Sequence, residues 1–401
     1  MNGIAGAPPG TPLHEGKRRI AAAVAAHRDE IVSLSHSIHA DPEPAFQEVH
    51  AAAKVAEALR RHGYVVQAPA GRLATAIRAS MAGGRGGDGP RVGILAEYDA
   101  LPGLGHGCGH NTMAASGVGA AIALAEMAPE LRGEIVFLGT PAEEAGSGKQ
   151  VMLDDGLFEG LDAALLFHPG DRDHAACMLL ACEDVEVTFS GLQAHAASDP
   201  WRGRNALDAM ILLFTSIGLW RQQLPQHARV HGIITEGGTA ANIIPDRSVG
   251  HFMIRSTDQA YFESMRRRFR EMVTAAALAT GTESATAFSS GSTVMRDSAT
   301  LAARFRANME AAGRVDQGVD PERIGSSDMG NVSRALPTIH PTLAICDDGV
   351  PGHSTLFRDA AATPRADETT LLAATLVAQT AYELFSEPGL VEAVWREFRD
   401  A

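Results

Sequence analysis

The sequence EYDALPGLGHGCGHNTMAASG, residues 97–117, marks a passage from a strand through a glycine-rich loop into a helix. It follows the apolar run RVGILA (91–96), and it leads into residues 111–128, whose small and apolar side chains predict a helix. This order of elements is typical of α/β sheets. Cys108 and His110 are separated by one residue, so in an extended segment both side chains would share one face and could bind one metal ion.

The Cys-x-His pair alone is a weak indication of a metal site, because cysteine and histidine also serve as packing and loop residues. Asn111, the next residue, is expected to cap the helix that begins there. Glu97 and Asp99 come directly after the apolar run and therefore lie at the end of the predicted strand.

Outward from this stretch, short β-branched runs alternate with segments in which apolar residues recur at helical spacing. Residues 17–40 and 47–63 are predicted to be helices, separated by DPEPAF. Strands are then expected at YVVQAP (64–69), LATAIRAS (73–80), RVGILAEYD (91–99), GEIVFLGTP (133–141) and DAALLFH (162–168). This order predicts an α/β fold with a mostly parallel sheet and helices on both of its faces.

The pattern changes at about residue 184. Strands are expected at 185–191, 228–237 and 248–256, and long helices at 203–224 and 258–279. The chain then returns to alternating elements and ends in a predicted helix over 367–385. We therefore expect a catalytic domain made of residues 1–183 and 294–401, with a smaller α+β domain inserted at 184–293.

Further candidate groups follow other predicted strands. Glu143 and Glu144 are adjacent, and in extended backbone they would point to opposite sides, so that one could bind a metal while the other faces a water. His168 ends an apolar run, and His353 lies in the glycine- and proline-rich segment GVPGHST. Each has a plainer explanation alone, as a solvated carboxylate or a core histidine. Parallel strands bring their carboxyl ends to one edge of the sheet, so we expect these groups to lie close together. Together they provide enough thiolate, imidazole and carboxylate ligands for two metal ions.

The composition excludes several functional classes. The chain has 401 residues, of which 45% are hydrophobic, and a formal net charge of −14 without a lysine- or arginine-rich run, so we expect no nucleic-acid partner. No segment approaches the roughly 18 apolar residues of a membrane span, and residues 1–30 contain no apolar leader core, so we expect no membrane association. Four scattered cysteines favour a reducing cytoplasm over a disulfide framework.

Seven segments in family order resemble a known superfamily: EYDALPGLGHGCGHN, PAEEAGSGK, FHPG, FSGLQAHAA, GGTAANIIPD, GSSDMGNVS and GHST. The resemblance extends from about residue 30 to the end of the chain. It is to the zinc-dependent aminoacylase, acetylornithine deacetylase and carboxypeptidase superfamily. Within it the match is to the amidohydrolase branch, which includes the p-aminobenzoyl-glutamate and indole-acetyl-amino-acid hydrolases.

The resemblance implies two divalent metal ions, zinc or manganese, whose ligands would be Cys108, His110, Glu144, His168 and His353. It implies Glu143 as the general base and acid, and Asp99 as an orienting aspartate beside the metals. The wider superfamily has His-x-Asp where this chain has Glu97-Tyr98-Asp99. Cys108 and His110 would replace the lost imidazole and a bridging aspartate.

The inserted segment resembles a lid and dimerisation domain. By this likeness His195 would stabilise the oxyanion, often in the partner subunit's site, while Asn242 and Arg255 would hold the substrate's carboxylate. The implied activity is hydrolysis of an N-acyl amino acid, an aminobenzoyl-glutamate-like amide or a small dipeptide, in a homodimer or higher homo-oligomer.

Two alternatives remain open. A cysteine hydrolase would use Cys108 as nucleophile and His110 as base, although residues two apart on one strand are poorly placed to form that pair. A non-catalytic protein could keep the fold and bind a metal ion or an amino acid, although such a protein has no need of Glu143.

Overall fold

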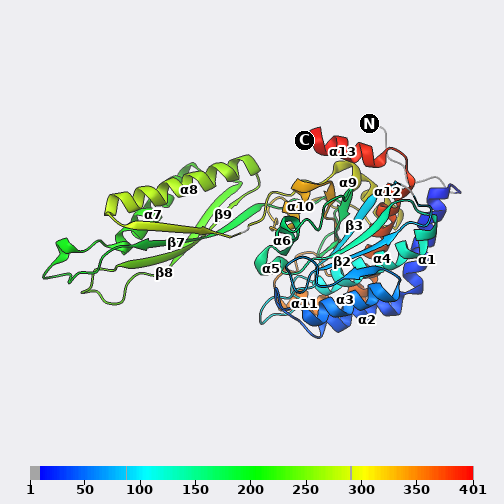
Figure 1. Ribbon diagram of the computed structural model, residues 1–401, viewed down its shortest axis with the longest axis horizontal. Coiled ribbons are helices and arrows are strands. Elements are labelled where there is room, and N and C mark those ends of the chain that lie inside the picture. The colour runs from blue at the N-terminus through cyan, green and yellow to red at the C-terminus, as the bar shows by residue number, and fades with distance from the viewer. Residues whose placement is uncertain (1–9, 87, 290, 401) are drawn as a thin grey trace. The chain divides into compact units, whose positions relative to one another are not determined.

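The computed structural model describes residues 10–86, 88–289 and 291–400 (Figure 1). Residues 1–9, which belong to the segment where the sequence predicts no leader, lie outside the described residues. The chain divides into two compact units. The first unit comprises Met1–Met178, Met295–Arg323 and Asn331–Ala401, and the second unit comprises Leu179–Val294 and Ile324–Gly330.

The first unit is built on a six-stranded sheet with the order β1-β2-β4-β3-β5-β11. Strands β4, β3, β5 and β11 are parallel, whereas β1 and β2 pair antiparallel. The bounds are β1 Val65–Gln67, β2 Ile77–Ala82, β3 Arg91–Ala96, β4 Glu134–Gly139, β5 Ala163–Leu165 and β11 Thr338–Ile339. Ile94 of β3 lies in register between Phe137 and Leu165, and all three side chains are fully buried. The predicted α/β class with a mostly parallel sheet is confirmed.

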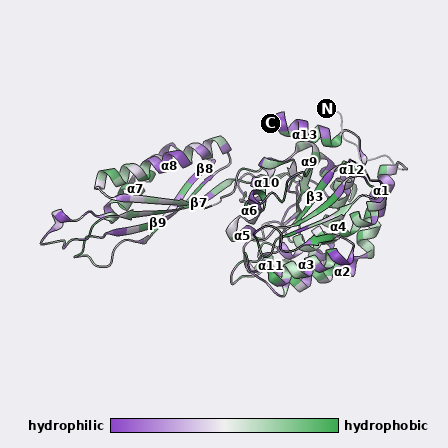
Figure 2. Ribbon diagram, in the orientation of Figure 1, coloured by the Kyte–Doolittle hydropathy of each residue, from purple (hydrophilic) through white to green (hydrophobic). Residues whose placement is uncertain are grey.

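Helices surround this sheet, and α4 lies at the centre of the packing. It contacts β3 and β4 and is covered by α1, α2 and α12. The bounds of the helices before β7 and after β10 are α1 Pro12–Ala26, α2 Arg28–His39, α3 Val49–Arg61, α4 His110–Met127, α5 Glu143–Gly146, α6 Gly148–Asp154, α9 Ala299–Ala311, α10 Met329–Ala335, α11 Thr355–Ala360, α12 Pro364–Ser386 and α13 Leu390–Asp400. Figure 2 shows hydrophobic and hydrophilic residues alternating along outer helices such as α2, as expected when one face is buried.

The segment predicted as one helix over 17–40 forms two helices, α1 and α2, which meet at His27. This residue leaves helical geometry, with φ −100° and ψ 16°. Its backbone N–H still donates to Ala23 O at 3.2 Å and so closes α1. The junction places the His27 side chain beside Glu30 of α2.

The second unit is an antiparallel sheet with the order β10-β7-β9-β8, and helices α7 and α8 pack on one side of it (Figure 1). The bounds are β7 Ala181–Ser190, α7 Ala206–Trp220, β8 Ala228–Glu236, β9 Arg247–Ser256, α8 Gln259–Thr280 and β10 Glu283–Phe288. Phe189, Leu213 and Phe269 are fully buried between these helices and the sheet. The unit therefore has a hydrophobic core of its own.

Residues 324–330 belong to the second unit, although the sequence analysis placed them in the second part of the catalytic domain. Leu180 N donates to Gly325 O at 3.0 Å and so ties this segment to the start of β7. The division into catalytic and inserted domains at 183/184 and 293/294 stays a prediction. All four cysteines are described, and none of them forms a disulfide. Among the described residues, no helix combines the length and apolar character needed to cross a bilayer.

Candidate metal centre

Polar side chains gather at the carboxyl ends of the parallel strands in the first unit. Glu97 follows β3, Glu143 follows β4, His168 follows β5 and His340 follows β11. Because these four strands are parallel neighbours, their carboxyl ends meet at one edge of the sheet. His340 was not among the residues proposed from the sequence.

Cys108 and His110 meet through a tight loop, so the extended backbone expected for them is wrong. Gly109 between them has φ 74° and is the N-cap of α4, whose first residue is His110. This φ favours glycine, and a Cβ at position 109 would also lie 2.8 Å from Pro169 Cγ. The loop nevertheless brings ligand atoms of Cys108, His110 and Glu144 within 4.8 Å of one another.

Asn111 does not cap α4, contrary to the expectation from the sequence. The helix begins one residue earlier, and Asn111 is a buried residue of its first turn. Its Nδ2 donates to Ser35 Oγ of α2 and to Ala361 O, both at 2.9 Å. Asn111 therefore anchors the loop to α2 and to the segment after α11.

Asp99 connects two of the candidate ligands. His110 Nδ1 lies 2.9 Å from Asp99 O and 3.1 Å from Asp99 Oδ1, and Glu144 N donates to Asp99 Oδ2 at 2.9 Å. With Nδ1 engaged, His110 Nε2 is directed at Glu97 Oε2, 3.2 Å away. Burial alone lowers the pKa of His110, but its hydrogen bond to Asp99 and the charges of Glu97 and Asp99 raise that pKa well above the usual value. A carboxylate that fixes the distal nitrogen of a histidine is typical of metal sites.

Glu143 and Glu144 begin the short helix α5, so the extended backbone expected for them is also wrong. Ala142 before them has φ 59°, an uncommon value for alanine, and its N–H donates to the buried Glu48 Oε1 at 2.9 Å. Neighbouring side chains on a helix point about 100° apart, so the two carboxylates still diverge. The Glu144 side chain is buried, and Glu143 is half-buried.

His168, which is half-buried, and His340, which is buried, are neutral neighbours of Glu97. His168 Nδ1 donates to Pro169 O at 2.6 Å, which leaves Nε2 available to bind a metal ion. Burial lowers the pKa of His168 to about 4 and that of His340 to about 3. The two rings are 5.4 Å apart at an interplanar angle of 78°. A neutral imidazole is the form that binds a metal ion.

His353 reaches the same cluster from late in the chain. Its Nε2 lies 3.6 Å from Glu144 Oε2, and its backbone N–H donates to Gly107 O at 3.0 Å. Its side chain is 61% exposed, whereas that of Glu144 is 6% exposed. His353 therefore stands on the solvent side of the cluster.

The surroundings of Cys108 argue against a free thiolate nucleophile. Burial raises the pKa of the Cys108 thiol far above its usual value, and the charges of Glu144 and Glu143 raise it further. Nucleophilic cysteines need the opposite environment. A bound metal ion would instead favour the thiolate form of Cys108, because a coordinated thiol is deprotonated.

The residues fit a centre for divalent cations. Two overlapping groups have ligand atoms close enough to hold an ion, one of Glu97, His110 and His168 and one of Cys108, His110 and Glu144. In the part of the chain that the structure describes, the buried Glu97 Oε2, His110 Nε2 and Glu144 Oε1 form no hydrogen bond, although the first two lie 3.2 Å apart as an ion pair. Buried polar atoms without partners are costly, and a cation would satisfy them. Thiolate, imidazole and carboxylate ligands suit zinc, and the carboxylates also admit manganese.

Glu97 and Lys149 were not assigned a role from the sequence. Lys149 of α6 is fully buried, and its Nζ lies 2.5 Å from Glu97 Oε1. Burial raises the pKa of Glu97, but the Lys149 ammonium outweighs it and holds that pKa below its usual range. Glu97 therefore remains an anion directed at His110. Lys149 ends the segment PAEEAGSGK and is one of only three lysines in the chain, which is the signal that the sequence offered.

His195 and Asn242 lie together in the second unit. Ala196 N donates to Asn242 O at 3.0 Å, and His195 pairs with Ile243 in an isolated antiparallel bridge. His195 Nδ1 accepts from Ala197 N at 3.1 Å and from Ser198 N at 3.2 Å. The neutral ring must then carry its proton on Nε2, which is free to act as a donor.

Arg255 is separated from these two residues. It pairs with Cys182 at one end of the β7–β9 ladder, whereas His195 and Asn242 lie beyond the other end, where Ser190 pairs with Arg247. Eight residue steps along β9 correspond to about 26 Å. Within one chain the structure therefore does not bring Asn242 and Arg255 together.

Comparison with known proteins gives the chain a family. The model of peptidase family M20/M25/M40 matches residues 93–380. Xaa-Arg dipeptidase of Mus musculus is 36% identical over 398 residues, which cover 96% of this chain and 92% of that protein. One of the proteins that form the p-aminobenzoyl-glutamate hydrolase of Escherichia coli is 33% identical over 294 residues, which cover 67% of this chain and 60% of that protein.

A solved structure supports the fold. The crystal structure of a dinuclear metal binding peptidase of the M20 family from Bacillus subtilis superposes with a TM-score of 0.70 at 19% identity, over 92% of this chain and 99% of that one. The named relatives are a dipeptidase and a hydrolase, which favours catalysis over the alternative of a non-catalytic binding protein. The chain is an enzyme, a metal-dependent amidohydrolase, as its motifs predict. It belongs to the peptidase family M20/M25/M40.

Proposed function

We propose that this enzyme hydrolyses the amide bond of a small dipeptide with two divalent ions held by Cys108, His110, Glu144, His168 and His353. The observation that carries the proposal is the convergence of ligand atoms on His110, where three buried polar atoms have no hydrogen-bond partner among the described residues. Zinc or manganese ions bound there would polarise the amide carbonyl and acidify a water.

The chain's own residues supply the proton transfers and the orientation. Glu143, next to the ligand Glu144, takes a proton from the attacking water and returns it to the departing amine nitrogen. Asp99 holds the His110 ring and the Glu144 backbone in fixed positions through both of its carboxylate oxygens. His195 Nε2–H donates to the developing oxyanion.

Dipeptides are the proposed substrate class because the match to an Xaa-Arg dipeptidase spans nearly the whole chain. The match to a p-aminobenzoyl-glutamate hydrolase spans two thirds of it. The test is a comparison of kcat/KM, with zinc- or manganese-loaded protein, among dipeptides with basic or acidic C-terminal residues, p-aminobenzoyl-glutamate and N-acetyl amino acids. The highest value for a dipeptide supports this class, and the highest value for either other group contradicts it.

We also propose a homodimer formed through the second unit. Strand β8 lies at the edge of the sheet and exposes Ile233 and Ile234, and α7 exposes Ile211, Leu212 and Leu219. An open strand edge beside exposed apolar side chains is suited to pairing with a second copy. In such a dimer Arg255 of one chain and Asn242 of the other would hold the same substrate carboxylate, which the separation along β9 prevents within one chain.

A complementation experiment tests this arrangement. Glu143→Gln and His195→Ala are each expected to be inactive alone. In a mixed dimer, the subunit with His195→Ala keeps its own Glu143 and would receive an intact His195 from the other subunit. Recovery of activity after unfolding and refolding the mixture supports a shared site. Mixed dimers that form but stay inactive contradict it.

We propose that the enzyme works in the cytoplasm. Four unpaired cysteines, one of them a proposed metal ligand, would stay reduced in that compartment. Fractionation of the native cells with an antibody against the enzyme tests this location.

A further inference from the structure

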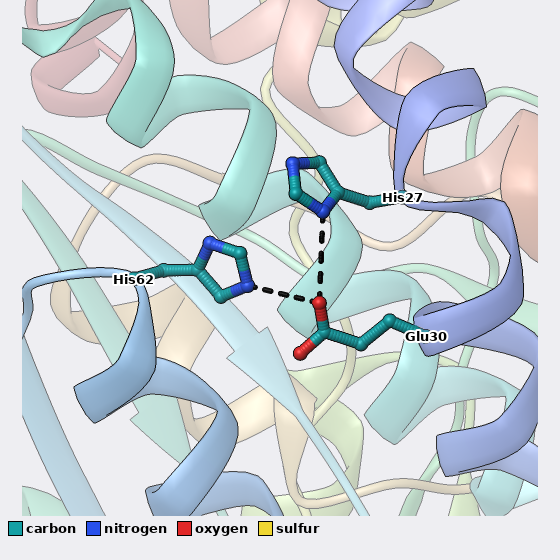
Figure 3. A group of neighbouring side chains, drawn as sticks. All are labelled: His27, Glu30 and His62. Atoms are coloured by element: carbon teal, nitrogen blue, oxygen red, sulfur yellow. Dashed lines mark hydrogen bonds and ion pairs between the residues drawn. The ribbon is translucent and has the colours of Figure 1, made fainter.

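A second cluster with metal-ligand chemistry lies outside the proposed catalytic centre. It consists of His27 at the junction of α1 and α2, Glu30 in the first turn of α2, and His62 directly after α3 (Figure 3). One ligand atom of each residue lies within 4.8 Å of the others. Figure 3 shows both imidazole rings directed at the same carboxylate oxygen.

Both distances in the cluster are compatible with a coordination sphere, and one of them is too long for a hydrogen bond. His62 Nε2 lies 3.0 Å and His27 Nδ1 lies 3.6 Å from Glu30 Oε2. Ligands of a tetrahedral zinc ion, each about 2.0–2.2 Å from the metal, stand roughly 3.3 Å from one another. The second distance is too long for a good N–H···O hydrogen bond. The two rings are 4.9 Å apart and nearly perpendicular, at 85°.

Glu126 contacts the other nitrogen of the His27 ring. His27 Nε2 lies 3.1 Å from Glu126 Oε1, so a neutral ring carries its hydrogen on Nε2 and donates a hydrogen bond to that carboxylate. Nδ1 then presents its lone pair to Glu30 Oε2. A lone pair facing a carboxylate oxygen is unfavourable, and either a second proton on the ring or a cation bound between the two atoms removes this repulsion. Histidine ligands of metal ions commonly have such a carboxylate on the distal nitrogen.

Arg61 fixes the Glu30 carboxylate from the other side. Arg61 Nη2 donates to Glu30 Oε1 at 2.6 Å, which leaves Oε2 for the two imidazoles. Burial raises the pKa of Glu30, but its bonds to Arg61 and His62 outweigh this and lower the pKa. The side chains of His27, Glu30 and His62 are 28%, 27% and 19% exposed, so water can complete the coordination.

We propose that His27 Nδ1, Glu30 Oε2 and His62 Nε2 bind a divalent transition-metal ion of the zinc class, at a site separate from the catalytic centre. Two imidazoles and one carboxylate suit zinc, nickel or copper, whereas magnesium and calcium require oxygen ligands. The ion ties the α1–α2 junction to the end of α3. Since α2 and α3 both pack against α4, binding stabilises this helical layer and leaves the chemistry of amide hydrolysis unchanged.

The test counts zinc ions per chain by equilibrium dialysis against a zinc buffer followed by elemental analysis. The wild type is expected to bind one more ion than His27→Gln or His62→Gln, and zinc is expected to raise the melting temperature of the wild type more than that of either variant. The matched control is His50→Gln, because His50 is an exposed histidine with carboxylate neighbours, Asp41 and Glu43, but is not part of a candidate metal group. Hydrolytic activity should be equal in all four proteins.

Equal zinc content in the wild type and both variants overturns the proposal. So does a loss of zinc in His50→Gln as large as that in His27→Gln or His62→Gln. If a variant fails to fold, a second measurement uses the wild type alone. Crystals of the wild type grown with zinc, with diffraction recorded at the zinc absorption edge, should give an anomalous peak within coordination distance of His27 Nδ1 and His62 Nε2. A peak only at the Cys108 centre contradicts the proposal. Magnesium in place of zinc should not change the melting temperature through this cluster.

Discussion

Lys149 Nζ lies 2.5 Å from Glu97 Oε1, and both side chains are fully buried beside the proposed metal ligands. The other oxygen of this carboxylate, Oε2, lies 3.2 Å from His110 Nε2. Glu97 thus connects a buried ammonium to the centre of the candidate site. The pair keeps a negative charge next to His110 where burial alone would favour the neutral acid.

Lys149→Met should destabilise the enzyme and weaken its metal binding. Removing one partner of a buried ion pair leaves an uncompensated charge, which typically costs about 3–5 kcal/mol. Loss of the ammonium would also raise the pKa of Glu97 and so weaken its attraction for a cation. Denaturant unfolding measures the first effect, and metal content after dialysis measures the second.

The double variant Lys149→Met, Glu97→Gln separates charge from packing. It should recover much of the lost unfolding free energy, because no unpaired charge remains. Its metal affinity should stay low if Glu97 contributes to the site. A double variant as unstable as Lys149→Met would show that lost packing, and not charge, causes the destabilisation.

Glu143→Gln should abolish turnover while the metal ions stay bound. Glutamine cannot accept the proton of a water, and the loss of a general base typically lowers the rate by about 10²–10⁴-fold. Neighbouring Glu144→Gln should instead lower metal content, because Glu144 belongs to a candidate metal group. Elemental analysis and kcat together distinguish the two residues. Substantial activity in Glu143→Gln would contradict its role as the base.

Cys108→Ala should lose metal and therefore activity. A Cys108 thiolate would be the most strongly donating ligand of its candidate group, and alanine cannot replace it. The control is Cys346→Ala, because Cys346 is also an unpaired cysteine but is not a member of a candidate metal group. Elemental analysis should show reduced metal in the first variant and wild-type metal in the second. A fully metal-loaded Cys108→Ala protein would show that Cys108 is not a metal ligand. Wild-type activity that survives a chelator would favour the cysteine hydrolase over the metal enzyme.

The layered fold could be predicted because its signals are local. Apolar runs such as RVGILA and the alternation of strands with helices already specify an α/β sheet, and a parallel sheet predicts where polar groups will meet. The same rule would have found His340, which directly follows β11. That strand has only two residues, Thr338 and Ile339, and is too short to be recognised from periodicity.

The local geometry of the site could not be predicted from alternation. Gly109 and Ala142 both adopt positive φ, which replaces the expected extended segments by the starts of α4 and α5. The ion pair between Lys149 and Glu97 could not be predicted either, because Glu97 lies 52 positions earlier and no local pattern links the two. Tertiary packing creates this pair, and the sequence shows only a lysine in a segment of small residues.

Asp297→Asn should make the stability of the enzyme less dependent on pH. Asp297 Oδ2 accepts from Cys177 N, while Oδ1 is buried without a hydrogen-bond partner among the described residues. Burial raises the pKa of Asp297 from its usual 3.8 to about 7. A carboxyl whose pKa is raised by folding contributes its full stability below about pH 4, and that contribution is lost as the pH rises through about 7.

The difference in unfolding free energy between Asp297→Asn and the wild type isolates this group from the histidines that titrate in the same range. The variant should gain on the wild type as the pH rises from about 4 to about 7, by an amount on the order of a few kcal/mol, because asparagine stays neutral throughout. Urea unfolding of metal-free protein at several pH values measures it. A difference that is constant with pH would mean that Asp297 is ionised in the folded enzyme, with a cation or a water at Oδ1 that offsets its burial.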